Sequence, residues 1–234
     1  MVARAVIGQT PGPVTLGGQW AFVANMGDGT VSQLSRSTGR VVATIRVADP
    51  HALLAQGCAP DSVHAYYSGS WGWRACDTPY AIAWDGAALW ALDNGDRALV
   101  EVDPNKQVTA RRIPLPGTGW SVAIYAGTAY VSGFADAHGL YVVNLRSGDV
   151  ATIDDLDTGP ATLSADATGV WVACARAGAG RLDRIDLAAR RVTARYQMEW
   201  WSTAVLADHG YVFVRGTFGG DITKLDVSGE VIWS

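Results

Sequence analysis

Asp136 and His138 are the two residues of this chain whose types and spacing best suit acid–base chemistry. A histidine titrates near neutrality and can accept or release a proton, and a nearby carboxylate can orient its imidazole ring. We therefore name His138 as the candidate general acid or base and Asp136 as its orienting partner. The alternative interpretation of the same pattern is an ordinary polar loop over residues 133–139.

Arg176 and Arg215 are the candidates for holding an anionic group of a ligand or substrate. A guanidinium group presents planar N–H donors that pair with two oxygens of a carboxylate or phosphate at once. We expect both arginines in loops of successive repeats, where they could act on the same ligand. The alternative is that they only keep the surface soluble.

Two acidic segments, residues 93–96 and 154–157, are the candidate cation sites, because a hard cation takes several oxygen ligands. Neither has the spacing of a calcium-binding loop, so we interpret both as solvated turn carboxylates. The scattered cysteines and histidines show no zinc-ligand spacing. We predict no metal and no cofactor, with a divalent cation as the alternative.

Several large aromatic residues stand outside the repeat described below. Such side chains, when they converge on exposed loops, can form the mouth of a pocket or anchor a partner. In the alternative interpretation they pack beneath an inserted lid as a small satellite core. The candidate ligand-binding set, besides the two arginines, consists of Trp71, Trp73, Tyr80, Trp120, Trp200 and Trp201.

The elements that would position these residues follow from a repeat of about 40 residues. An aromatic residue returns along the chain, and its last four occurrences are 40, 41 and 42 residues apart. Eight positions before each aromatic stands an aliphatic residue. Repeats of this length made of short strands are typical of a β-propeller. The aromatics are Phe22, Trp90, Tyr130, Trp171 and Phe213, and the aliphatics are Val14, Ile82, Val122, Leu163 and Val205.

We predict an all-β fold, a single β-propeller domain over residues 1–234 with four-stranded blades. Each blade has strands A to D; in the second repeat these are residues 80–84, 88–92, 98–102 and 108–113. Five blades are the simplest count. A sixth blade degenerated into residues 48–77, or a fragment of a larger propeller, are the alternatives. Residues 3–8 also resemble a D strand of a preceding blade.

Four antiparallel strands place the B–C loops and the D-to-A connections at one end of a blade, and the candidate residues fall at this end. The A–B and C–D turns at the other end are short. We predict that Asp103, Asp186 and Asp226 cap C–D turns, because Asp accepts hydrogen bonds from the backbone two or three residues on. Function is therefore expected at the B–C end.

Residues 20–32 and 37–45 resemble the YVTN and NHL-like propeller repeats, in particular those of the virginiamycin B lyase-like group. Residues 78–82 and 89–96 support the resemblance, which covers nearly the whole chain outside residues 48–77. It implies the propeller fold. In the lyase-like relatives a histidine and a divalent metal support elimination chemistry, but their catalytic motif has no matching positions here.

Residues 48–77 form an insertion, a possible lid, that contains Cys58 and Cys76. A bridge between these cysteines would close a long loop and stabilise it by about 3 kcal/mol in the chain-entropy model. Such a bridge implies an oxidising, extracytoplasmic compartment. Two unrelated thiols are the alternative and would suit a cytoplasmic protein, and the first residues show no apolar signal core.

The composition excludes several classes of function. The formal net charge is −4 without any run of Lys or Arg, so we predict no nucleic-acid partner. No apolar stretch is long enough for membrane insertion. We expect a binding module for a small molecule or a protein partner. The alternative is a lyase or hydrolase with its acid–base site at the channel mouth, and a third possibility is a sensor domain of a larger, membrane-anchored chain.

Overall fold

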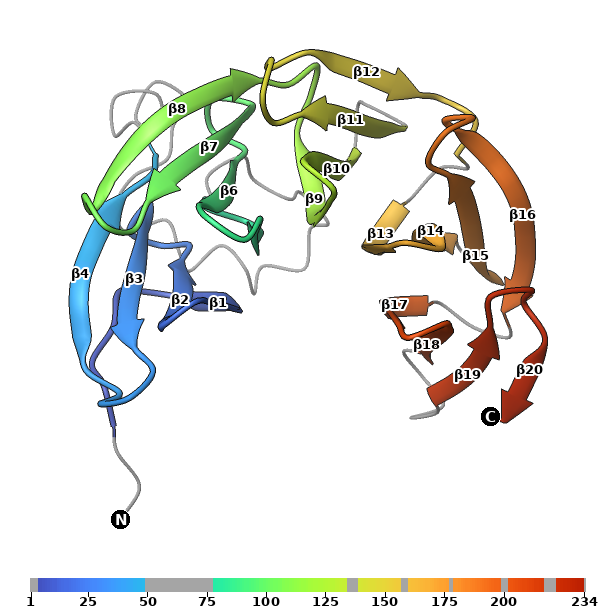
Figure 1. Ribbon diagram of the computed structural model, residues 1–234, viewed down its shortest axis with the longest axis horizontal. Helices are drawn as coiled ribbons and strands as arrows, with labels where there is room; N and C mark the ends of the chain where they lie inside the picture. The colour runs from blue at the N-terminus through green and yellow to red at the C-terminus, as the bar shows by residue number, and fades with distance from the viewer. Residues whose placement is uncertain are drawn as a thin grey trace, which may run out of the picture. The chain divides into compact units, whose positions relative to one another are not determined.

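The structure is a computed structural model that describes residues 4–48, 78–133, 139–156, 160–176, 179–198, 202–216 and 222–233. The described residues form twenty β-strands in five four-stranded antiparallel sheets, one for each repeat (Figure 1). No helix that could span a membrane is found in these ranges. The predicted all-β class and the five four-stranded repeats are confirmed.

Each sheet is a simple up-and-down arrangement in which neighbours along the chain pair. The first sheet contains β1 (Pro11–Gly17), β2 (Trp20–Asn25), β3 (Thr30–Ser35) and β4 (Val41–Arg46). The second contains β5 (Ile82–Trp84), β6 (Leu89–Asp93), β7 (Ala98–Asp103) and β8 (Val108–Pro114). The third contains β9 (Gly119–Tyr125), β10 (Thr128–Gly133), β11 (Leu140–Asn144) and β12 (Val150–Ile153). The fourth contains β13 (Pro160–Asp166), β14 (Gly169–Arg176), β15 (Ala179–Asp186) and β16 (Arg191–Met198). The fifth contains β17 (Ser202–Asp208), β18 (Tyr211–Gly216), β19 (Ile222–Asp226) and β20 (Val231–Trp233).

The chain forms two compact units, Met1–Thr118 and Gly119–Ser234. The first unit holds the first and second sheets, and the second unit holds the other three. Apart from Ala48, the predicted insertion lies outside the described residues. Residues 4–8 are assigned to no strand, and the backbone N–H of Gln9 donates to the side chain of Asp28. The expected pairing of residues 3–8 as a D strand stays a prediction.

Every sheet has two different faces, because side chains alternate along a strand. In the first sheet Phe22 lies opposite Thr15 and Gln33, whereas Val23 lies opposite Val14 and Ser32. We call the face that carries the repeat's aromatic residue the aromatic face. The opposite one, which carries the repeat's aliphatic residue, is the aliphatic face. The registers of the other four sheets repeat this division.

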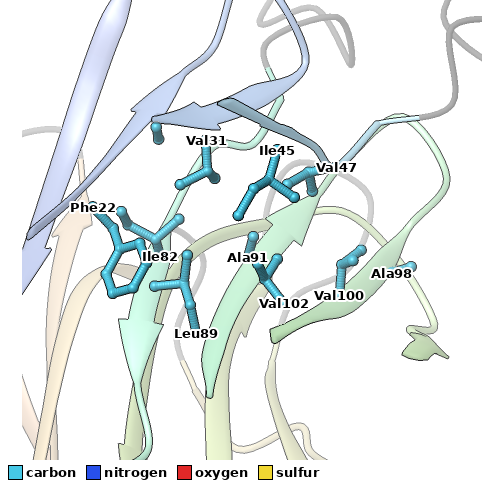
Figure 2. Close-up of a cluster of buried hydrophobic side chains, with 11 residues drawn as sticks. Phe22, Val31, Ile45, Val47, Ile82, Leu89, Ala91, Ala98, Val100 and Val102 are labelled. Atoms are coloured by element: carbon cyan, nitrogen blue, oxygen red, sulfur yellow. The ribbon is translucent and has the colours of Figure 1, made fainter. Parts of the chain in front are cut away.

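The core of the first unit lies between the aromatic face of the first sheet and the aliphatic face of the second. Phe22 and Val31 point toward Ile82 and Leu89 (Figure 2). The ring of Phe22 also stacks on Trp84, with centroids 5.7 Å apart and an interplanar angle of 18°. Burial of apolar surface on both sides joins the two sheets.

The second unit repeats this packing twice. Tyr130 and Leu140, on the aromatic face of the third sheet, pack against Leu163 and Val172 of the fourth. Trp171, on the aromatic face of the fourth sheet, belongs to a cluster with Val212 and Leu225 of the fifth. The prediction that the repeat aromatics are core residues is confirmed for Phe22, Trp90, Tyr130 and Trp171, which are all buried, while Phe213 is half-buried.

The C–D turns are closed by aspartates, as the sequence predicts. The side chain of Asp103 accepts hydrogen bonds from the backbone of Asn105 and Lys106. Asp186 and Asp226 accept equivalent bonds in their own turns. The C–D turns are therefore short and closed by hydrogen bonds. The longer connections lie at the opposite, B–C end of each sheet.

Candidate binding site

Most of the predicted site residues lie outside the described residues. They are Asp136 and His138, the tryptophans Trp71, Trp73, Trp200 and Trp201, and the cysteines Cys58 and Cys76. Their proposed chemistry and pairing therefore stay predictions.

The structure places three of the predicted side chains and the backbone of a fourth. Tyr80 is half-buried just before β5, where its backbone N–H donates to the carbonyl of Leu92 over 2.9 Å. Trp120 is half-buried in β9 of the second unit. Arg215 is an exposed residue of β18, and Arg176 is the last residue of β14.

The expectation that both arginines stand in B–C loops is wrong, because the strands remain paired to their positions. Arg176 pairs with Ala179 of β15, and Arg215 pairs with Ile222 of β19. Arg215 lies on the aromatic face of the fifth sheet. The equivalent positions two residues after each aromatic hold buried residues elsewhere: Ala24, Leu92, Ser132 and Ala173.

Asp93 is the centre of a buried polar cluster at the B–C end of the first unit. It is the last residue of β6 and is fully buried. Its Oδ1 accepts hydrogen bonds from the hydroxyl of Thr78 over 2.9 Å and from the backbone N–H of Gly95 over 3.0 Å. Its Oδ2 is paired with the guanidinium of Arg112, which also contacts Asp96 at 2.7 Å. Both oxygens of this carboxylate thus have hydrogen-bond or ion-pair partners within the protein.

Burial raises the pKa of Asp93 above its ordinary value of 3.8. Loss of hydration disfavours the charged form, and the nearby carboxylate of Asp96 adds to this effect. The hydrogen bond from Thr78 and the charge of Arg112 act in the opposite direction without cancelling it.

The same cluster ties separate connections of the first unit together. Arg112 donates from its other terminal nitrogen to the carbonyl of Val47 over 2.7 Å. The backbone N–H of Val47 in turn donates to Gly29 in the B–C turn of the first sheet. Thr78 donates its backbone N–H to Met26 in that turn. The B–C turns of both sheets and the D-to-A segments are thereby fixed at one end, as the strand order predicts.

The interpretation of residues 93–96 as solvated turn carboxylates is wrong for Asp93 and holds only for the exposed Asp96. Sequence reasoning missed the cluster because the partners Thr78 and Arg112 are 15 and 19 positions away from Asp93. A usable signal was present: Asp93 stands three residues after the repeat aromatic, as Asn25 does in the first sheet.

Asn25 forms a second buried polar group at this end. Its amide donates to the hydroxyls of Thr30 and Ser32 over 3.0 and 2.9 Å. Gly8 packs so closely on the side chains of Asn25 and Asp28 that a Cβ there would lie within 2.2–2.7 Å of them. The residue at the end of strand B is therefore a bracing position in both sheets of this unit.

The fourth sheet contains another buried carboxylate. Asp183 in β15 is fully buried, and Arg181 lies 2.6 Å from it. Within the described ranges no group of three or more His, Cys, Asp or Glu residues is placed to hold a metal ion. Asp93, Asp96 and Asp183 instead pair with arginines, and Asp103, Asp186 and Asp226 close turns.

An open groove of about 440 Å³ is found at the other end of the first sheet. It lies between residues 4–6 and the C–D turn, with Arg4, Thr38 and Arg40 among its lining residues. This groove is at the end where the sequence predicts no site, and it contains none of the predicted site residues.

Comparison with solved structures identifies the fold. The chain is similar to the β-propeller domain of Cps50 (Swd1) from Myceliophteria thermophila, with 11% identity, a TM-score of 0.69, and coverage of 94% of this chain and 67% of that chain. It is similar to BamB from Moraxella catarrhalis, with 16% identity, a TM-score of 0.65, and coverage of 94% and 59%. It is also similar to a catalytically inactive virginiamycin B lyase from Staphylococcus aureus with quinupristin, with 10% identity, a TM-score of 0.71, and coverage of 96% and 69%.

These likenesses concern the fold alone, because the identities are low. No family model matches the chain, and no curated protein matches it. The specific YVTN or NHL-like resemblance therefore stays a prediction. With five four-stranded antiparallel sheets and β-propellers among its structural neighbours, this chain has a five-bladed β-propeller fold.

Proposed function

We propose that this β-propeller is a binding module that takes a small ligand or a protein partner at its B–C end. The observation that carries the proposal is the network around Asp93. It holds the turn at residues 94–97 and the segment before β5 in fixed positions. A surface that is ordered before binding loses less entropy when a partner docks.

The chemistry of the network supports binding rather than proton transfer. Asp93 accepts from Thr78 and Gly95 and is paired with Arg112, so both of its oxygens serve to position the chain. Around it the B–C end presents the half-buried Tyr80 and the exposed Asp96. An aromatic side chain beside charged ones is a common composition for a recognition surface.

Two charge reversals at opposite ends of the first unit test this proposal. Arg97 is exposed in the B–C turn after β6, and Arg40 is exposed next to the C–D turn of the first sheet. Partners captured by the immobilised full chain from its own cells are quantified for wild type, Arg97→Glu and Arg40→Glu. We expect a loss of at least about tenfold for Arg97→Glu only, about 1.4 kcal/mol of binding free energy.

Equal recovery of all partners by the two variants would contradict the proposed face. Circular dichroism and thermal melting of both variants provide the control for folding. For small ligands, the same two variants are compared with wild type in a thermal-shift screen. A ligand that binds only the native state raises the melting temperature, so the size of this rise reports binding to each variant.

A lyase or hydrolase is the second candidate, supported by the resemblance of the repeats to the lyase-like group and by Asp136 and His138 in one short segment. In this case His138 acts as acid or base and Arg176 and Arg215 hold an anionic group. The test is ring opening of quinupristin by the full chain, with and without added Mg²⁺. Turnover that His138→Ala abolishes would favour this candidate over the binding module.

We also propose an extracytoplasmic location for the protein. Its support is the pair Cys58 and Cys76 within one inserted segment, since bridges between cysteines persist in oxidising compartments. Fractionation of cells that produce the protein tests this directly, with a cytoplasmic enzyme as marker.

A further inference from the structure

β16 is the last strand of the fourth sheet, and it pairs with β15 along one of its two edges (Figure 1). Within the described ranges, its backbone forms hydrogen bonds with no backbone other than that of β15. The blades of a β-propeller are arranged radially around a central channel, so the outer edge of this strand lies at the perimeter of the fold. Such an edge presents backbone N–H and C=O groups with which an added strand can pair.

This outer edge is longer than the equivalent edges of the other four sheets. β16 has eight residues, whereas β4, β8, β12 and β20 have six, seven, four and three. β8, the next longest, ends in Pro114, which has no backbone N–H to donate. A bulge at Thr193 interrupts β16 near its start, but Ala194–Met198 pair without interruption with Gly180–Arg184. The regular part of the edge therefore extends over about 17 Å.

The side chains of β16 that pack into the second unit hold this edge in place. Tyr196 stacks on Trp171, with ring centroids 6.0 Å apart, and its hydroxyl donates to the carbonyl of Ser228 over 2.9 Å. Met198 packs against the same buried cluster. The edge is thus ordered before any strand is added to it, which lowers the entropy cost of docking.

Arginines dominate the exposed charged side chains along this edge. Arg191 and Arg195 lie in β16, and Arg190 directly precedes it. Of the nearby carboxylates, Asp155 bonds to Arg195 over 2.7 Å, and Asp186 accepts hydrogen bonds from the backbone of its own turn. In the described part of the chain no carboxylate pairs with Arg190 or Arg191. The edge is therefore positively charged, although the formal net charge of the chain is −4.

This charge selects the kind of strand that fits. A second copy of β16 would bring arginines close to arginines, and like charges on paired strands are destabilising. Charged side chains are one means by which natural proteins keep exposed edges from pairing with copies of themselves. An extended segment that carries Asp or Glu would instead form opposite-charge pairs across the strands.

We propose that the outer edge of β16 is a docking site for an extended, acidic peptide segment of another protein. The segment adds to the fourth sheet as a further strand, with main-chain hydrogen bonds to Ala194–Met198. Arg191 and Arg195 favour acidic side chains in it. This site is separate from the B–C end, so its failure would leave the proposed function of that end untouched.

Selection from a library of random decapeptides displayed on phage, with the full chain immobilised, tests this inference. The selected peptides are expected to be rich in Asp and Glu and free of Pro, and fluorescence anisotropy then measures their affinity. Arg191→Glu should weaken binding at least about tenfold, which corresponds to about 1.4 kcal/mol. Arg46→Glu, at the exposed arginine that ends β4, is the matched control and should bind like wild type. Melting curves of both variants check their folding.

Pairing of the backbone is tested separately from attraction of charges. Amide hydrogen exchange in residues 191–198 should slow when a selected peptide binds, and the same peptide N-methylated throughout should not bind. The inference is overturned if no peptide is enriched, or if a bound peptide leaves exchange in β16 unchanged. Equal binding of the N-methylated peptide also overturns it, because attraction of charges alone would then account for the contact.

Discussion

Asp93 and Arg112 form an ion pair in which the carboxylate is completely buried and the guanidinium reaches the surface. The carboxylate ends β6 and the arginine lies in β8, so the pair joins two strands that are not neighbours in the second sheet. Through Val47 the arginine also reaches the connection that follows the first sheet. This one pair thus links the core of a blade to the turns proposed for binding.

Removal of the guanidinium should therefore destabilise the fold strongly. Arg112→Met leaves a buried carboxylate without its cation, a change that costs roughly 3–5 kcal/mol for a fully buried pair. Because the Arg112 side chain is 36% exposed, we expect about 2–3 kcal/mol of lost unfolding free energy. Urea unfolding monitored by circular dichroism measures it.

The neighbouring Arg111 provides the matched control. It pairs with Glu101 over 3.2 Å at a partly exposed site and lies over the ring of Trp90. Arg111→Met should cost no more than about 1 kcal/mol. Equal losses for the two variants would show that the buried pair has no special role.

The pKa of Asp93 predicts a pH dependence of stability. Burial raises this pKa above 3.8, so between 3.8 and the raised value the folded chain holds a proton that the unfolded chain has lost. The resulting stabilisation is complete below pH 3.8 and is lost as pH rises through the folded pKa. Asp93→Asn cannot titrate, and its unfolding free energy should fall less than that of wild type over this range.

Asp226 contributes a pH dependence of stability with the opposite sign and serves as the comparison. The Ser228 hydroxyl and backbone N–H groups lower its pKa, so its contribution is present above pH 3.8 and is lost as pH falls through the folded pKa. Urea midpoints of wild type, Asp93→Asn and Asp226→Asn across the acidic range separate the two effects. Parallel curves for wild type and Asp93→Asn would refute the assignment.

The repeat was predictable from sequence because one physical requirement recurs in each blade. A large aromatic such as Phe22 or Trp171 fills the space between adjacent sheets of one unit, and its position fixes the central strand. The predicted ends of the strands are less accurate. The sequence predicts strand A of the second blade over residues 80–84, but β5 is Ile82–Trp84. The N–H of Tyr80 still bonds to Leu92, so the chain approaches β6 before regular pairing begins.

The candidate site was predictable only in its location at the B–C end. Loop composition points to Asp93 as a turn residue, since Asn94 and Gly95 follow it. Its burial depends on Thr78 and Arg112, which reach it through the fold and leave no periodic trace in the sequence. Long-range polar contacts of this kind become visible only when the strands are assembled.

Gly229 and Gly210 provide a test of packing in the second unit. Both have positive φ values, 88° and 81°, which disfavour any residue with a Cβ. A Cβ at Gly229 would lie 1.8 Å from the ring of Tyr196, whereas nothing lies within 4 Å of one at Gly210. We expect about 1–2 kcal/mol of destabilisation for Gly210→Ala from the backbone alone, and clearly more for Gly229→Ala.

The extra cost at Gly229 arises because Tyr196 must move and give up its hydrogen bond to the carbonyl of Ser228. Chemical unfolding of both variants measures the difference, with Tyr196→Phe as a control that removes only the hydroxyl. If the two glycine variants lose the same free energy, the contact between this turn and β16 is not tight in solution.

The proposed bridge between Cys58 and Cys76 predicts a redox-dependent stability. The third cysteine, Cys174, is buried in β14 and should react with alkylating reagents only after unfolding. Native protein made under oxidising conditions should therefore take up no reagent, and reduction should expose two reactive thiols and raise the intact mass by two hydrogens. Opening the loop should lower the unfolding free energy by about 3 kcal/mol.

Cys58→Ser should behave like the reduced wild type, whereas Cys174→Ala should keep the full response to reductant. Two thiols that react in the native, unreduced protein would rule out the bridge and remove the support for an extracytoplasmic location.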